Sequence, residues 1–241
     1  MGYGHYGLVG FGFDWTYLLV ILGAVLSMAA SAKVKGTYQK YSRDWSVSGM
    51  TGADVARQIL RSQGIYDVTV RQVPGELTDH YDPRSRTVNL SASVYGSASI
   101  AAVGVAAHEC GHVIQDATEY IPLRLRAALV PAANFGATLS WPLLLLGLFL
   151  GEMGPFFIQL GLLLFSLSVL FQLVTLPVEF NASARALKIL SGSQILAQGE
   201  VKKAREVLGA AALTYVAAAA ASLLQFLRLF ILFGGRRRDD R

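Results

Sequence analysis

The sequence predicts a mainly α-helical integral membrane protein, with four transmembrane helices and a small α+β insertion between helices 1 and 2. Apolar residues make up 53% of the 241 residues and charged residues only 15%, and the mean hydropathy is +0.44. A soluble domain has about 25% charged residues. Disorder is excluded because it needs low hydrophobicity and high net charge. The apolar residues are gathered in four long segments, and one long polar stretch separates the first from the second.

Each apolar segment is long enough to cross about 30 Å of hydrocarbon at about 1.5 Å per residue. The segments cover residues 15–32, 127–150, 155–178 and 208–233. Only residues 151–154 separate the second from the third, so these two should form an antiparallel hairpin. Prolines 131 and 142 lie in the second segment and are tolerated in membrane helices.

The first segment could also be a signal peptide, because Ala30-Ser31-Ala32 resembles a cleavage site. A signal peptide begins with a positively charged region, whereas residues 1–13 contain no Lys or Arg. We therefore expect a retained transmembrane helix. The single cysteine, Cys110, excludes an internal disulfide framework.

Four spans place the loops over 33–126 and 179–207 on one face of the membrane, and both chain ends on the other. Basic residues near the membrane are more numerous on the loop face, which favours a cytoplasmic location for it. The loop face carries Lys33, Lys35, Lys40, Arg43, Arg124, Arg126, Arg185, Lys188, Lys202, Lys203 and Arg205. The opposite face carries Arg236, Arg237, Arg238 and Arg241, which argue the other way.

The chain divides into five predicted regions: 1–32, 33–126, 127–178, 179–207 and 208–241. In the second, Thr51 and Asp54 resemble a capping box that begins a helix ending at Gly64. Alternating apolar residues then predict a strand around 68–73, and a turn at 82–85 precedes a second strand over 87–90. The pattern is helical again from about 97 to 116.

That last helix contains His108-Glu109-Cys110-Gly111-His112, which has the pattern H-E-x-x-H. On a helix, residues four apart lie about 40° from each other and one turn along, so both imidazoles can face one ion. Glu109 lies about 100° round from His108, where it can take a proton from a water instead of binding the metal. The pattern predicts Zn²⁺ as the cofactor, the two histidines as ligands, and Glu109 as the catalytic base.

A catalytic zinc site needs a third protein ligand and one position for water. Gln115 and Thr118 stand where a metzincin has its Gly and third His, which excludes that subclass. Glu119 lies about 10 Å beyond His112 along a continuous helix, out of reach. Glu179 follows the third apolar segment, and the two intervening spans bring it to the same membrane face as the motif. We predict Glu179 as the third ligand; the alternative is an acidic residue that complements its helix dipole.

Four stretches resemble the YugP-type neutral zinc metallopeptidases of bacterial membranes. They read S-G-M-T-G-A-D-V-A (48–56), L-T-D-H-Y-D-P-R (77–84), V-A-A-H-E-C-G-H (105–112) and L-P-V-E-F-N-A-S (176–183). The layout is also similar to the HtpX and CAAX prenyl protease group, in which two spans separate H-E-x-x-H from a downstream Glu and the site lies at the cytoplasmic face. The resemblance implies a zincin-like catalytic insertion with a gluzincin-like ligand set.

In that group, an Asp four residues after the ligand Glu supports the site. Here Ser183 holds that position, so Asn181, Ser183 and Asp116 are the candidates to orient a ligand imidazole. His80 and Arg185 are candidates to stabilise the oxyanion or contact substrate, with local hydrogen bonding as the alternative for each. The strand over 87–90 could pair with an extended substrate.

We expect a zinc metalloendopeptidase of the bacterial inner membrane that cleaves membrane or membrane-proximal proteins in protein quality control, with its active site facing the cytoplasm. The predicted partners are the lipid bilayer and a peptide or membrane-protein substrate. A membrane-protein partner or a homo-oligomer stays open, and nucleic acid is excluded because no binding motif with interleaved aromatics occurs.

The same motif suits two alternative functions. An intramembrane protease would bury the motif within a span, but the apolar run over 98–107 before His108 is too short to cross. The other alternative is a non-catalytic membrane scaffold or partner-binding subunit in which zinc is structural. A closed zinc site with four protein ligands would indicate that scaffold.

Overall fold

The structure is a computed structural model of the chain, and it describes residues 14–234. The predictions made for residues 1–13 and for the arginines from Arg236 to Arg241 lie outside this range. Within it the protein is mainly helical, with one small mixed sheet.

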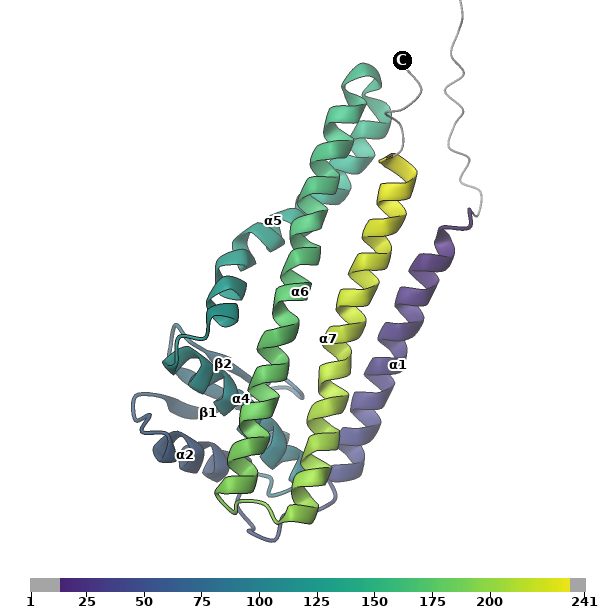
Figure 1. Cartoon of the computed structure of the whole chain (residues 1–241). Helices are drawn as coiled ribbons and strands as arrows, with labels where there is room; N and C mark the ends of the chain where they lie inside the picture. The colour runs from purple at the N-terminus through teal and green to yellow at the C-terminus, as the bar shows by residue number, and fades with distance from the viewer. Residues whose placement is uncertain (1–13, 235–241) are drawn as a thin grey trace, which may run out of the picture.

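Four helices in this range are long and apolar enough to cross a membrane. They are α1 (Tyr17–Tyr41), α5 (Ile121–Phe149), α6 (Gly154–Gly192) and α7 (Gln198–Phe233). A short 3-10 turn, η1 (Gly151–Met153), joins α5 to α6. The helices pack mainly on their neighbours in the order α5, α6, α7, α1, so they form one row (Figure 1).

The helices are longer than the apolar segments that predicted them. The stretch over 179–207 was predicted as a loop or helix region with the third ligand; in the structure α6 continues to Gly192 and α7 begins at Gln198. Hydropathy marks only the part of a helix that suits hydrocarbon, whereas the helix itself continues through polar residues. At about 1.5 Å per residue, α6 is about 58 Å long, nearly twice the thickness of a bilayer core.

Small residues bring the membrane helices close together. A Cβ on Gly136 of α5 would lie 2.4 Å from the Leu164 carbonyl oxygen of α6, and one on Gly23 of α1 would lie 3.1 Å from the Ala221 Cα of α7. Close backbone approach at small residues is the usual packing mode in lipid, where no hydrophobic force pulls the helices together.

Between α1 and α5 the chain forms a smaller α+β unit. Its elements are α2 (Gly52–Ser62), β1 (Thr69–Val73), β2 (His80–Asp82), β3 (Thr87–Ser91), α3 (Ala92–Tyr95) and α4 (Ile100–Ala117). The capping box at the start of α2 is present, with Thr51 and Asp54 each bonding the other's backbone N–H. Apolar side chains of α2, β3 and α4 share one buried core, which includes Ile59, Leu90 and Val103.

The sheet differs from the prediction at its centre. The strand order is β1-β3-β2, with β1 parallel and β2 antiparallel to β3. The predicted strand over 87–90 is therefore the central strand, and both of its edges are already paired, so its predicted pairing with an extended substrate is wrong. The short strand β2 was not predicted because only three residues form it, between a polar loop and the turn at 82–85.

Helix α4 packs against the half of α6 and α7 that lies away from η1 (Figure 1). At Gly111 the α4 backbone comes so close to α6 that a Cβ would lie 2.5 Å from the Ala182 carbonyl oxygen. The approach of α4 to α7 is looser: a Cβ built on Gly104 would lie 3.7 Å from the Ala204 Cβ. The motif helix is thus held in direct backbone contact with the long membrane helix α6.

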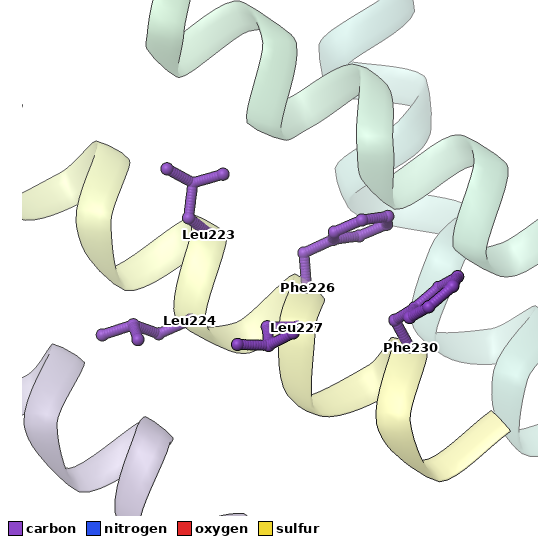
Figure 2. A pocket seen from close by; sticks show the side chains of 5 residues that line it. All are labelled: Leu223, Leu224, Phe226, Leu227 and Phe230. Atoms are coloured by element: carbon purple, nitrogen blue, oxygen red, sulfur yellow. The ribbon is translucent and has the colours of Figure 1, made fainter. Parts of the chain in front are cut away.

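Helix α7 also carries an apolar groove, shown in Figure 2. Its lining residues are Leu223, Leu224, Phe226, Leu227 and Phe230. Because all five side chains are hydrocarbon, the groove suits lipid chains and offers no polar group for catalysis.

Candidate metal centre

Three potential metal ligands converge where α4 meets α6. His108 and His112 come from α4, and Glu179 comes from the middle of α6. The imidazole Nε2 atoms of His108 and His112 lie 3.2 Å and 3.5 Å from the same Glu179 carboxylate oxygen, Oε2. The Glu179 side chain is only 3% exposed, so this meeting point is shielded from solvent.

The spacing of these atoms fits zinc. Zinc bonds of about 2.0–2.2 Å in tetrahedral geometry place two ligand atoms about 3.3–3.6 Å apart. The two Nε2–Oε2 distances are close to that spacing. Two imidazole nitrogens and one carboxylate oxygen are also the donor set of a catalytic zinc site that keeps a position for water.

The other nitrogen of each imidazole has a protein partner. His108 Nδ1 lies 3.1 Å from the Ser183 hydroxyl oxygen, and His112 Nδ1 lies 3.0 Å from the Gln115 side-chain oxygen. Partners at Nδ1 fix the orientation of a ligand imidazole and leave Nε2 free for the metal. Ser183 was one of the residues predicted for this role. Gln115 was not predicted for it; its position served only to exclude the metzincin subclass.

The direction of the hydrogen bonds through Gln115 follows from its neighbours. Its amide nitrogen donates to the Val178 backbone carbonyl at 2.8 Å and to the Asn181 side-chain oxygen at 3.0 Å. A carbonyl can only accept, so the Gln115 oxygen must face His112. The neutral form of His112 then carries its proton on Nδ1, which leaves its Nε2 lone pair free for a metal.

Glu109 is buried beside the ligands, with 7% of the residue exposed. Burial alone lowers the pKa of His112, but the hydrogen bond with Glu179 and the charges of Glu109 and Glu179 outweigh it and raise that pKa above its usual value. The charge of Glu109 therefore acts directly on the ligand set. The neighbouring Cys110 thiol points into the core toward the Ala56 carbonyl, as a packing residue does.

Glu179 does not begin a helix. It was expected at the start of a helical stretch, but α6 extends 25 residues before it, from Gly154. The alternative interpretation of Glu179, an acidic residue that complements a helix dipole, loses its basis because that effect is confined to the first turn.

The remaining candidates are placed further out. Asp116 accepts a hydrogen bond from the Tyr81 hydroxyl at 2.8 Å and lies 4.0 Å from Arg86, so its described partners are in the sheet and not the imidazoles. His80 is exposed on β2, where its ring nitrogens face the Thr78 carbonyl and the Asn89 side chain. These contacts match the local hydrogen bonding that was the alternative for His80.

Arg185 and Asn181 act at a distance from the ligands. The Arg185 Nε donates to the Asn181 side-chain oxygen at 2.8 Å, and that oxygen also accepts from Gln115. The Arg185 guanidinium lies over the Tyr120 ring, 5.8 Å from its centre. Asn181 is thus linked to His112 through Gln115. Arg185 is linked to His112 through Asn181 and Gln115.

Comparison with known proteins identifies the family of the chain. Residues 16–234 match a family described as "Putative neutral zinc metallopeptidase". The chain is 47% identical over 222 residues to a Bacillus subtilis (strain 168) protein named "Putative membrane protease YugP", with 92% of this chain and 98% of that protein covered. No solved structure gives a significant match. The chain belongs to this family of neutral zinc metallopeptidases.

Proposed function

We propose that the protein is a membrane-embedded, zinc-dependent endopeptidase in which His108, His112 and Glu179 bind the metal. The observation that carries the proposal is the meeting of both Nε2 atoms at one Glu179 oxygen. Family membership and the name of the Bacillus relative support the same chemistry.

Glu109 is the residue proposed to move a proton. When bound, the metal would polarise a peptide carbonyl and lower the pKa of a water molecule. Glu109 lies on the same helix as both histidines and is not one of the three converging ligands, so its carboxylate is free to accept the proton from the attacking water. Its low exposure keeps this carboxylate away from bulk solvent.

The position of Glu179 along α6 indicates the substrates. The apolar part of α6 ends at Val178, and the helix continues for another 13 residues after Glu179, to Gly192. A site at this boundary would lie at the bilayer surface, where segments next to a membrane span can reach it. We infer that the substrates are membrane or membrane-proximal proteins, as expected for protein quality control.

We further propose that the protein resides in the bacterial inner membrane with this site facing the cytoplasm. The basic residues next to the spans support this orientation, because they are more numerous on the side of the metal centre.

The test combines zinc content with cleavage of an unstructured protein such as casein, using detergent-purified protein. Wild type and Glu109→Gln should each hold about one zinc per chain, and only wild type should cleave. Glu179→Ala should lower the zinc content. Glu119→Gln is the matched control, because this exposed carboxylate lies just beyond the end of α4 and pairs with Arg124.

Three results would contradict parts of the proposal. Equal zinc loss in Glu109→Gln and Glu179→Ala would contradict the separate roles of the two carboxylates. Cleavage by Glu109→Gln at the wild-type rate would contradict its role as base. Zinc in both proteins without cleavage in either would favour the non-catalytic scaffold.

A further inference from the structure

The Glu179 carboxylate has a second set of partners, which come from the helices on either side of α6. Its Oε2 atom faces the two imidazoles, whereas its Oε1 atom lies 3.6 Å from the Arg126 Nη1 atom. The Tyr215 hydroxyl also lies close enough to interact with this carboxylate, and with Glu109 and Arg126. Arg126 belongs to α5 and Tyr215 to α7, the two helices that flank α6 in the row (Figure 1).

A buried carboxylate needs such partners. Glu179 is 3% exposed, and an unpaired oxygen of a buried anion carries a large desolvation cost. The terminal torsion of a Glu side chain is also broad, so an unrestrained carboxylate can rotate. The Arg126 guanidinium beside Oε1 keeps Oε2 directed at the imidazoles.

We propose that Arg126 and Tyr215 are positioning residues that hold Glu179 from the membrane helices, so that its Oε2 atom stays in place as a metal ligand. The proposal rests on the zinc-binding role proposed for Glu179. It means that three neighbouring membrane helices build the metal centre together with α4, which supplies the histidines, Glu109 and Gln115.

The charge of Arg126 has an opposite effect that the test must separate. A guanidinium near a cation repels it, so removing only a positive charge would strengthen metal binding. Removing a partner that orients a ligand weakens metal binding, typically by about 10- to 100-fold. The direction of the change therefore shows which effect dominates. Lysine keeps the charge of Arg126 but lacks the planar fork of donors.

Arg124 provides a matched control on the same helix. It lies two residues before Arg126, its side chain is 67% exposed, and it pairs with Glu119 at 3.4 Å. The Arg126 side chain is 32% exposed and pairs with Glu179. Substitution of either arginine by Gln removes the same charge from α5, but only one of the two changes affects the metal ligand.

The experiment measures zinc affinity by competition with a chromophoric chelator in detergent, which needs no substrate. We expect Arg126→Gln to bind zinc about 10- to 100-fold more weakly than wild type, with Arg126→Lys in between. Tyr215→Phe should also bind more weakly, and Arg124→Gln should match wild type within about twofold. Protection of the Cys110 thiol from a maleimide reports that each variant is folded.

Wild-type or tighter zinc affinity in Arg126→Gln would overturn the role of Arg126. An equal loss in Arg124→Gln would overturn the role as well, because the effect would then come from charge on α5 in general. If Arg126→Gln does not fold, Tyr215→Phe decides, because it removes one hydroxyl and no charge. If the wild-type protein binds no zinc, the proposed function itself is contradicted. If it binds zinc with an affinity that these substitutions do not change, only the positioning role is contradicted.

Discussion

The carbonyl oxygen of Ala182 occupies the space that a side chain on Gly111 would need. A Cβ built on Gly111 would lie 2.5 Å from that oxygen and 3.0 Å from the carbonyl carbon. Gly111 immediately precedes His112 on α4, and Ala182 immediately precedes Ser183 on α6. The close contact therefore brings the face of α4 that carries the two histidines within reach of both Glu179 and the partner of His108.

Gly111→Ala should separate α4 from α6 and weaken zinc binding by at least about tenfold, because backbone atoms on both sides must move. Chelator competition measures the affinity, and thermal unfolding measures the accompanying loss of stability. Gly104→Ala is the matched control on the same helix, since its new Cβ would make an ordinary 3.7 Å contact. Wild-type zinc affinity in Gly111→Ala would contradict the need for this close approach.

Gln115 is expected to set the metal affinity through His112. Gln115→Leu removes the acceptor for the His112 Nδ1–H group and both donors to α6. We expect zinc affinity to fall by about 10- to 100-fold and stability by about 1–3 kcal/mol. Titration with a chelator and thermal unfolding test both numbers. Gln58→Leu, on the exposed face of α2, should change neither.

The spans and the motif could be predicted from sequence because both are local patterns. Long apolar runs identify α1, α5, α6 and α7, and H-E-x-x-H is a spacing within one helix. Glu179 was predicted from its place at the end of the third apolar segment, and the even number of intervening spans supported it. The helix ends were predicted less well because the polar residues after Val178 give no hydropathy signal although α6 continues through them.

The outer contacts of the site could not be predicted because they join residues far apart in the sequence. Gln115 is one turn beyond His112, but its link to Val178 depends on how α4 packs on α6. In the sequence, Arg126 is one of several basic residues near the membrane, and Tyr215 lies within an apolar segment. Gln115 could have been predicted from its position three residues after His112 in the sequence. Tyr215 is far from the motif in sequence, so no local pattern indicates it.

Cys110 should be unreactive in the folded protein. The thiolate is the reactive form, and burial raises the pKa of this thiol far above its usual value. A maleimide at neutral pH should leave native protein unmodified and label one thiol per chain after denaturation. Rapid labelling of native protein would show that the core around α2 and α4 is open.

The inertness of Cys110 allows topology to be mapped without replacing it. Ser93→Cys and Gln198→Cys introduce exposed thiols on the side of the metal centre, and Glu152→Cys introduces one in η1. With an impermeant maleimide on sealed cells, we expect labelling at position 152 only. Opening the membrane should expose positions 93 and 198. Labelling of position 93 or 198 in sealed cells would reverse the proposed orientation.

Zinc affinity should depend steeply on pH because a proton competes for His112. In the metal-free protein burial lowers the pKa of His112, but the hydrogen bonds with Glu179 and Gln115 and the charges of Glu109 and Glu179 together raise it above the usual value of about 6.5. Zinc needs the neutral imidazole, so the affinity should fall as pH drops through this raised pKa. Below it the imidazolium–Glu179 pair replaces the metal.

The same linkage predicts opposite effects of pH on stability with and without metal. A raised folded-state pKa stabilises the metal-free protein fully below the unfolded pKa, and this stability is lost as pH rises through the folded value. The zinc-loaded protein should instead gain stability over that range, because zinc binding strengthens as the proton leaves. Thermal unfolding at pH 6 and pH 8, with zinc and with a chelator, measures both slopes. Parallel slopes in the two states would contradict the assignment of His112 as a metal ligand.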